Sequence, residues 1–404
     1  MEDSLEELAL LAATAGAEVV GALVQRLTRP TPTYYLGKGK IEELAKLRVE
    51  VGYNVLLFDD ELSPTQQRNL ERALEVKIID RTALILDIFA KRAQTREGHL
   101  QVELAQHEYL LPRLAGQWSH LERLGGGIGT RGPGEAQLET DRRLVRKKIN
   151  RLKKEIEEVR KHRALYRRQR AQHDVPVVAI IGYTNAGKST LLNALSDANV
   201  FVEDKLFATL DPTTRRITLP NKQQVLISDT VGFIQKLPTT VIAAFRATLE
   251  ELSEAHLLLH VIDITHENAA EQSKTVDKIL SKLGLGDKPG IAVLNKVDLF
   301  VHREEDIGDL VKAVKQSGQQ AVLLSAAKGW GLDSLLQRIE QRLADRMTGI
   351  SLEVPYEAAK LVSLFQRYGS ASAQEYRDSG VLIRGEIPRR LLSRFEGIGS
   401  VKKG

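Results

Sequence analysis

The 404-residue sequence contains no cysteine. Disulfides, thiolate metal sites and cysteine nucleophiles are therefore excluded, which suits a reducing compartment. The chain also has no uninterrupted apolar run approaching the roughly 18 residues of a membrane helix, and residues 1–20 are acidic where a secretory signal is basic. We therefore expect a cytoplasmic protein without a membrane span, and we leave open whether part of it is peripheral to the membrane.

Acidic residues are scarce between residues 141 and 170, where 14 Lys or Arg face 4 Asp or Glu. The local excess is +10, so with a net charge of +5 the rest of the chain sums to −5. Apolar residues recur here at steps of four and three, namely Val145, Ile149, Leu152, Ile156 and Val159. This spacing predicts a helix that packs on a partner helix. Most charge runs are only solvated faces, but few intrahelical ion pairs are available here, which favours polyanion binding.

Residues 98–114 also read as a helix, and we predict that they form an antiparallel pair with the basic helix. Between the two helices, residues 116–143 include seven glycines, six of them between residues 125 and 134, and the arginines Arg123 and Arg131. Such a segment could be a flexible linker. Its place inside a helical pair favours a functional loop instead, because long irregular loops in compact domains are usually functional or disordered.

Residues 182–189 read GYTNAGKS, after the strand-like run 175–181 and before a helical pattern. This is the context of a phosphate-binding loop. Glycines tolerate the backbone angles that turn N–H groups inward around a phosphate, and the following helix presents its N-terminus to the anion. We expect Lys188 to contact the β- and γ-phosphates and the Ser189 hydroxyl to bind Mg²⁺. An ordinary strand-to-helix turn is the competing interpretation of this motif alone.

Three downstream segments favour a guanine nucleotide. The strand pattern 223–232 ends in Asp229, a candidate second-sphere carboxylate for Mg²⁺, and in Gly232, whose N–H fits a γ-phosphate contact. A second strand pattern ends in Asn295, Lys296 and Asp298. The Asp298 carboxylate can accept from guanine N1–H and the 2-amino group, a donor pair that adenine lacks. The third segment, 321–329, is a strand pattern followed by the small residues Ser325, Ala326 and Ala327, whose backbone N–H groups can approach guanine O6.

Switch I, the segment that closes onto Mg²⁺ and the γ-phosphate, should lie within residues 206–220. The threonine of switch I could be Thr209, Thr213 or Thr214, and the residues alone leave the choice open. Each could equally be a turn residue, since DPTT is good turn chemistry.

The remaining sequence divides into small domains. In residues 1–97, three segments read as strands (18–27, 54–62 and 76–80) and three as helices (40–51, 63–75 and 82–93). Residues 349–396 read as strand, helix, two strands and helix. We predict a multidomain α/β protein in which a P-loop G domain has a mostly parallel sheet with helices on both faces. The expected boundaries are 1–97, 98–172, 173–347 and 348–404, for the N-terminal α/β domain, the basic helical pair, the G domain and a small α+β domain.

The ordered combination of YYLGKGK, LGGGIGTRGPGE, LETDRR, GYTNAGKST, LFATLDPT, DTVGF, NKVD and SA resembles the HflX branch of the Obg-related translational GTPases. The resemblance covers nearly the whole chain. It implies a GTPase that engages the large ribosomal subunit and its rRNA through the N-terminal and helical regions, and that splits or rescues ribosomes under stress. It also implies that Thr209 is the switch I residue and that the protein acts as a monomer.

The expected site has catalytic and nucleotide-binding parts. The catalytic residues are Lys188, Thr209 and Gly232, with Mg²⁺ bound by Ser189 and Thr209. GTP or GDP contacts are expected from Gly182, Tyr183, Thr184, Asn185, Ala186, Gly187, Lys188, Ser189, Thr190, Phe207, Ala208, Thr209, Leu210, Asp211, Asp229, Thr230, Val231, Gly232, Asn295, Lys296, Val297, Asp298, Ser325, Ala326 and Ala327.

No glutamine follows Gly232 to orient the attacking water, because that position is Phe233. An apolar ring cannot polarise water, so we expect slow intrinsic hydrolysis that rises when a partner orders the switches. Asn185 could help to bind K⁺ beside the phosphates or could only make hydrogen bonds within the loop.

Other classes of function remain in competition. A GTP-gated assembly factor acting on free large subunits would carry the same motifs. A nonenzymatic RNA scaffold with a vestigial G domain is disfavoured by the complete motif set, and a P-loop helicase is disfavoured by Asp298.

Overall fold

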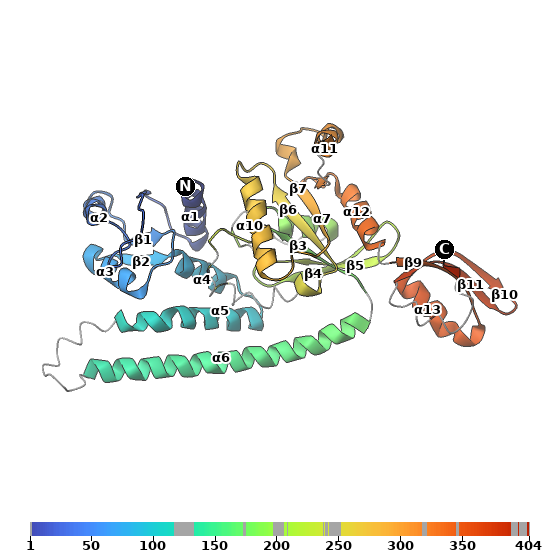
Figure 1. The fold of residues 1–404 in the computed structure, drawn as a ribbon, viewed down its shortest axis with the longest axis horizontal. Helices are drawn as coiled ribbons and strands as arrows, with labels where there is room; N and C mark the ends of the chain where they lie inside the picture. The colour runs from blue at the N-terminus through green and yellow to red at the C-terminus, as the bar shows by residue number, and fades with distance from the viewer. Residues whose placement is uncertain are drawn as a thin grey trace. The chain divides into compact units, whose positions relative to one another are not determined.

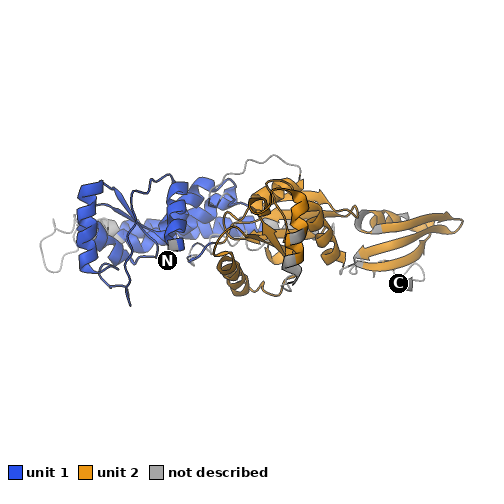
Figure 2. Cartoon of the chain, turned by 90° about the horizontal axis from the view of Figure 1, so that it is seen from above, with its two compact units in different colours: residues 1–163, 203–211, 234–247 blue, residues 164–202, 212–233, 248–404 orange. Residues whose placement is uncertain are grey.

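A computed structural model describes residues 2–116, 133–172, 175–196, 206–207, 209–236, 252–316, 321–344 and 347–388, together with Pro238, Val241, Phe395, Lys402 and Lys403. The chain divides into two compact units, which Figure 2 distinguishes by colour. The first comprises residues 1–163, 203–211 and 234–247, and the second comprises residues 164–202, 212–233 and 248–404. Most of the glycine-rich loop, residues 117–132, lies outside the described residues.

The first unit begins with a small α/β arrangement (Figure 1). Its elements are α1 Glu2–Ala15, α2 Lys38–Val51, β1 Val55–Phe58, α3 Pro64–Leu74, β2 Lys77–Asp80, α4 Arg81–Arg92, α5 Arg96–Leu110 and the 3₁₀ helix η1 Leu111–Gly116. Strands β1 and β2 are parallel, with Val55 opposite Lys77. Helix α3 starts as its sequence predicts: Ser63 and Gln66 form a reciprocal capping box and Pro64 occupies the first turn. The predicted helices 40–51, 63–75 and 82–93 and the strands at 54–62 and 76–80 are therefore confirmed.

The predicted strand at 18–27 is wrong, because residues 17–27 are described and form no strand. Strand β1 pairs only with β2 among the described residues. Without a neighbouring strand, Val19, Val20 and Val24 remain about half exposed, and only Leu23 of this segment packs against the cluster that contains Phe58. The apolar content of the segment was mistaken for strand periodicity, although Gly21 interrupts it.

Helix α6, Pro133–Gln172, confirms the predicted basic helix. Its predicted apolar seam is the less exposed side: Ile149 and Leu152 are buried, and Val145, Ile156 and Val159 are half-buried. Two ion pairs connect α6 to α5, from Lys148 to Glu103 at 2.9 Å and from Lys153 to Glu108 at 2.8 Å. The predicted pairing of these two helices is therefore confirmed, and Figure 1 draws them alongside one another.

The second unit contains a six-stranded sheet in the order β4-β5-β3-β6-β7-β8. Its strands are β3 Val177–Gly182, β4 Thr213–Thr218, β5 Gln224–Asp229, β6 Leu257–Asp263, β7 Gly290–Asn295 and β8 Ala321–Leu323. Only β4 is antiparallel to its neighbour. The helices are α7 Lys188–Ser196, α10 Ala269–Lys282, α11 Ile307–Gln316 and α12 Leu332–Ala344, with the 3₁₀ turns η3 Val297–Leu299 and η4 Glu304–Asp306.

Both faces of this sheet are buried, as expected for parallel strands. Successive residues of β3 point to opposite sides. Ile180 belongs to a core shared with α7 and α12, which includes Leu191 and Leu335. Its neighbour Ile181 belongs to the core on the other face, with Val276 of α10. The predicted α/β class, with a mostly parallel sheet and helices on both faces, is confirmed.

The C-terminal part forms a separate antiparallel sheet in the order β10-β11-β9-β12. Its elements are β9 Met347–Val354, η5 Tyr356–Ala358, α13 Ala359–Tyr368, β10 Ser370–Arg377, β11 Gly380–Pro388 and β12 Lys402–Lys403. The predicted sequence of strand, helix and two strands is confirmed. The predicted last helix falls almost entirely outside the described residues, and β12 was not predicted. Among the described helices, none combines the length and apolar character needed to cross a bilayer.

Candidate nucleotide site and switch segments

The loop 183–187 connects β3 to α7 and its backbone requires a glycine at one point. Asn185 and Gly187 both adopt positive φ angles, 61° and 90°. A Cβ on Gly187 would lie 2.3 Å from the Asn295 amide nitrogen, so no side chain fits there. The loop is therefore packed directly against the end of β7.

Lys188, Ser189 and Asp229, which are predicted to lie at the phosphates, are close together in the structure. Lys188 is buried, its Nζ donates to the Tyr183 carbonyl at 2.7 Å, and burial lowers its pKa to about 8 against the opposing pull of Asp229. The Ser189 hydroxyl donates to Asp229 Oδ2 at 2.6 Å. Because β3 and β5 are parallel neighbours, with Ile180 opposite Asp229, the sheet itself brings these groups together.

Gly232 and Phe233 are held against the same loop. Thr184 N–H donates to the Phe233 carbonyl at 2.7 Å, and Phe233 N–H donates to the Gly182 carbonyl at 3.0 Å. A Cβ on Gly232 would lie 2.7 Å from Thr184 Cα and 2.9 Å from Lys188 Nζ, which places this glycine beside the lysine. The Phe233 side chain is buried in the core that contains Leu252, so its ring packs in the protein interior.

Asn295, which is predicted to lie near the guanine base, connects two loops. Its amide donates to the Ala186 carbonyl at 2.9 Å, and its carbonyl oxygen accepts from Ala326 N–H at 3.0 Å. One side chain thus ties the loop 183–187 to the loop after β8. Asp298 Oδ1 is buried and has no hydrogen-bond partner within the part of the chain that is described. A buried carboxylate oxygen in that position is costly unless a donor reaches it.

Other predicted residues fall around these two groups of residues. Thr230 donates to the Ile180 carbonyl at 2.6 Å, Val231 and Val297 are buried, and Ala327 is exposed. The Ser325 hydroxyl accepts from Lys328 N–H at 3.1 Å and so shapes its own turn. Thr190 is half-buried in the first turn of α7. Ala208 lies outside the described residues.

Asp263 is a site residue that the sequence reasoning missed. It accepts from Lys296 Nζ at 2.7 Å and thereby holds the lysine, whose backbone is left-handed with φ 68°. The signal was present, because Asp263 ends the apolar strand β6 at the same sheet edge as Asn295, with which it is in register.

Phe207, Thr209, Leu210 and Asp211 are grouped with the first unit. The Asp211 carboxylate accepts from the backbone N–H groups of Gln94 and Thr95 at 2.8 and 2.9 Å, and from the Thr95 hydroxyl. The Phe207 ring lies 4.6 Å from the Phe89 ring, edge to face. Sequence reasoning missed these partners because they are more than a hundred residues distant along the chain.

The segment that follows Phe233 also belongs to the first unit. Lys236 Nζ lies 2.5 Å from Asp59 and 2.8 Å from Asp60. The Gln235 carbonyl accepts from Arg81 at 3.1 Å. Burial would raise the pKa of Asp60, but hydrogen bonds from Lys236 and Tyr35 outweigh it and hold the pKa below its usual value.

Three protein-family comparisons match successive parts of the chain. Residues 2–90 match a family described as "GTP-binding GTPase N-terminal", and residues 92–170 match its "Middle Region". Residues 177–296 match a family described as "50S ribosome-binding GTPase". With the phosphate loop and the Asn295–Asp298 segment at the carboxyl ends of parallel strands, these matches define a GTP-binding, GTP-hydrolysing P-loop protein.

Curated relatives extend the match to the whole chain. A GTPase HflX from Caldanaerobacter subterraneus is 48% identical over 98% of this chain and 90% of its own, and one from Escherichia coli is 44% identical over 94% and 88%. The chain belongs to the HflX family of GTPases. Among solved structures, a GTP-binding protein from Sulfolobus solfataricus in complex with GDP is 25% identical, with a TM-score of 0.43 over 84% of this chain and 95% of its own.

Proposed function

We propose that this GTPase binds the large ribosomal subunit and its rRNA through the α5–α6 region and the N-terminal domain, as a monomer in the cytoplasm. GTP binding and hydrolysis control that contact, and the outcome is the splitting or rescue of ribosomes under stress. The description of the family that matches residues 177–296 names the ribosome as the partner of its members. The expected domain boundaries at residues 97, 172 and 347 belong to the same proposal.

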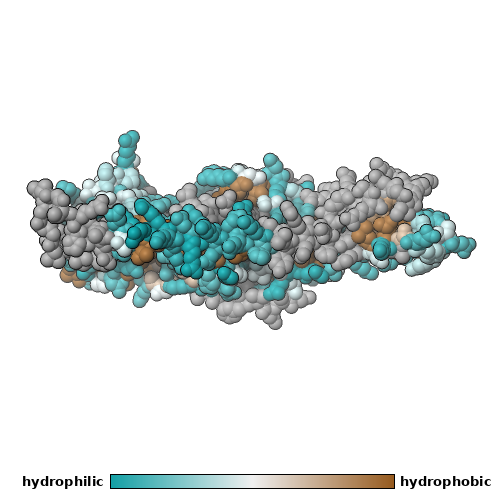
Figure 3. Space-filling view, turned by 90° about the horizontal axis from the view of Figure 1, so that it is seen from below, coloured by the Kyte–Doolittle hydropathy of each residue, from teal (hydrophilic) through white to brown (hydrophobic). Residues whose placement is uncertain are grey.

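The exposed basic face of α6 is the observation that carries the RNA contact. Several of its exposed cations have no ion-pair partner among the described residues, namely Arg143, Arg146, Lys147, Lys154 and Lys161. In the view of Figure 3 the described atoms are mainly hydrophilic, with apolar residues in small separate patches. A row of unpaired cations on one helix attracts a phosphate backbone through counterion release.

At the nucleotide site, the loop 182–187 cradles the phosphates and Lys188 neutralises them. The oxygen ligands Ser189 and Thr209 suit Mg²⁺, with Asp229 in the second sphere, because this small hard cation prefers oxygen donors. The 2.6 Å contact between Ser189 and Asp229 supports that assignment. Asp298 supplies the partner for guanine, since its buried oxygen needs a donor, and the loop from Ser325 to Ala327 approaches guanine O6.

Hydrolysis is slow in the isolated protein and faster on the ribosome, because Phe233 is buried and leaves no side chain at that position to orient water. Asn185, exposed in the loop with a left-handed backbone, is placed to help bind K⁺. Equal hydrolysis rates in K⁺ and Na⁺ would remove the cation role from Asn185.

Sedimentation of ribosomes with GTP, GDP or a nonhydrolysable GTP analogue tests the proposed function. Splitting predicts that 70S particles separate into subunits with GTP or the analogue and that the Lys188→Ala variant fails to separate them. The alternative, a GTP-gated assembly factor, predicts binding to free large subunits while 70S particles remain intact. Absence of binding in all three nucleotide states would refute both.

A further inference from the structure

The short segment 207–211 is held at both ends by the N-terminal part of the first unit. At its start, Phe207 is almost fully buried with a left-handed backbone, φ 55°, and packs on Phe89 of α4. At its end, Asp211 accepts hydrogen bonds from Gln94 and Thr95. A segment this short with an anchor at each end has little independent freedom.

The contact at Asp211 completes the N-terminal cap of α5. Thr95 is the N-cap residue, and its hydroxyl accepts from Gly98 N–H at 3.0 Å. The same hydroxyl donates its proton to the Asp211 carboxylate. Since a hydroxyl has a single proton, donation to Asp211 orients the lone pairs of Thr95 toward the helix. The carboxylate therefore fixes the geometry of the cap as well as adding two backbone contacts.

The fit around this carboxylate is close. A Cβ on Gly98 would lie 2.5 Å from Asp211 Oδ1 and 3.1 Å from its Cγ. The first turn of α5 is thus built around the carboxylate, because any side chain at position 98 would displace it.

Thr209 lies midway between the two anchors, two residues from each. An extended chain spans at most about 3.6 Å per residue, so Thr209 and Asp211 cannot separate by more than about 7 Å. A larger displacement of Thr209 toward a nucleotide must therefore be transmitted to Asp211 or to Phe207.

We propose that Asp211 is a positioning residue that couples switch I to the first turn of α5, so that the γ-phosphate of the bound nucleotide changes the stability of this cap. The inference rests on the proposed function in one respect, the assignment of Thr209 to Mg²⁺ and the γ-phosphate. Helix α5 bears Glu103 and Glu108, which pair with the basic helix α6. The cap thus lies on the element that contacts the surface proposed for RNA, and by linkage a ligand on that surface alters nucleotide preference in return.

Hydrogen exchange of the full-length protein tests this coupling. With GDP and with a nonhydrolysable GTP analogue, the peptide covering the first turn of α5 should exchange at rates that differ by about fivefold, the effect of a typical N-cap. In Asp211→Asn, which keeps the size of the side chain but removes its charge, the two nucleotides should give the same rate. Asp87→Asn on α4, whose carboxylate pairs with Lys91 on the surface, is the control and should retain the difference.

A second variant provides an independent test in case Asp211→Asn folds poorly. Gly98→Ala displaces the carboxylate by steric overlap and should abolish the same difference while Asp211 is intact. An undiminished nucleotide difference in both variants, or no difference in the parent protein, would overturn the proposal. The affinity of Thr209→Ala for the GTP analogue is measured in parallel. If this affinity is unchanged, the assignment of Thr209 in the proposed function is wrong. If Thr209→Ala loses affinity but Asp211→Asn keeps the exchange difference between the two nucleotides, only the coupling is refuted.

Discussion

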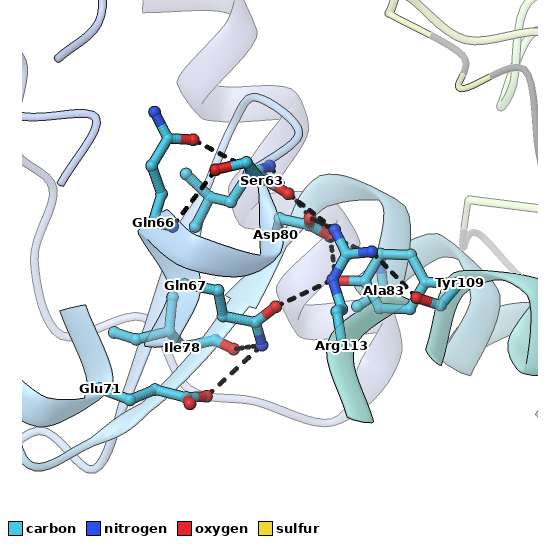
Figure 4. Close-up of polar contacts among 10 residues, drawn as sticks. Ser63, Gln66, Gln67, Glu71, Ile78, Asp80, Ala83, Tyr109 and Arg113 are labelled. Atoms are coloured by element: carbon cyan, nitrogen blue, oxygen red, sulfur yellow. Dashed lines mark hydrogen bonds and ion pairs between the residues drawn. The ribbon is translucent and has the colours of Figure 1, made fainter. Parts of the chain in front are cut away.

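Asp80 and Arg81 are neighbours in the chain but belong to two different polar networks. Asp80 accepts from Tyr109, from Ala83 N–H, from Leu62 N–H and from Arg113. Figure 4 shows Tyr109, Ala83 and Arg113 around it. Arg81 turns instead to Asp59 at 2.6 Å, to Glu7 and to the Gln235 carbonyl.

The two networks differ in reach and in burial. The partners of Asp80 lie between residues 62 and 113, and the side chains of Asp80 and Arg113 are 0% and 11% exposed. The second network starts at Arg81, whose side chain is 2% exposed. It extends outward to Lys236, where the side chains of Lys236 and Asp60 are both 44% exposed. Arg113 also stacks on the Tyr109 ring at 3.5 Å, and burial together with the Asp80 charge raises the pKa of Tyr109 well above its usual value. The first network therefore stabilises a local fold. The second holds the distant segment around Lys236, and water can compete for its ion pair with Asp60.

The largest expected effect is the loss of the buried network. Asp80→Ala leaves the Arg113 cation buried without its carboxylate, and breaking such a pair costs about 3–5 kcal/mol of folding free energy. Urea unfolding followed by circular dichroism should show this loss. Asp87→Ala on the following helix α4 serves as the control and should cost less than about 1 kcal/mol, because its ion pair with Lys91 is exposed. Equal losses in the two variants would contradict the distinction between the networks.

Lys188 is a third case to set beside the two networks. It is a buried cation whose hydrogen bond goes to a carbonyl rather than to a carboxylate. Its pKa is about 8 in the structure, and a bound phosphate favours the charged form. Above that pH, nucleotide binding must take up a proton, so GDP affinity should fall by up to about tenfold per pH unit. Below it, this lysine should contribute no pH dependence.

The lowered pKa of Lys188 also affects the folding stability of the nucleotide-free protein. Because the folded pKa lies below the ordinary value of about 10.5, the folded state gains stability as the pH rises through this window. Calorimetry in buffers of different ionisation enthalpy measures the proton uptake directly. Lys188→Arg, which does not titrate in this range, should remove it, and a flat GDP affinity from about pH 7 to 9.5 would show that the pKa is not lowered.

A smaller effect is expected at the exposed end of the second network. Lys236→Gln should change global stability by less than about 1 kcal/mol, since half-exposed ion pairs contribute little. Its effect should appear in hydrolysis, because the contacts to Asp59 and Asp60 restrain Lys236, which lies four residues after Gly232. Releasing that restraint should lower the intrinsic GTP hydrolysis rate about threefold, within the same energy, because hydrolysis is expected to rise when the switch segments are ordered. Lys91→Gln makes the same charge change without touching this segment, and an identical rate in both variants would refute the restraint.

The sequence predicted those parts of the molecule that depend on neighbours along the chain. The helix that begins at Ser63, the phosphate loop and the strands that end in Asp229 and Asn295 all follow from local patterns. The register of a parallel sheet then brings these strand ends to one edge, so their approach was also predictable.

Contacts between distant segments were not predictable in this way. Nothing in the residues around Asp211 indicates that its carboxylate will cap a helix at Thr95, and nothing near Lys236 indicates Asp59. The helix α1 was also missed, although its residues are mostly strong helix formers. What the sequence does not show is where this helix packs, with Leu11 and Ala12 fully buried. The failed strand at 18–27 has the same origin, since a strand needs a partner that the sequence alone does not specify.

The Asn295 amide has a consequence for local unfolding. Its two hydrogen bonds connect loops that follow β3 and β8 and lie on either side of β7. A fluctuation that frees Ala326 removes one of the two bonds that orient the amide, and thereby weakens the other, at Ala186. Regions joined in this manner open as one cooperative unit rather than singly. The loops proposed to contact phosphate and guanine should therefore open together, and we expect a nucleotide to dissociate in one concerted step rather than from one end first.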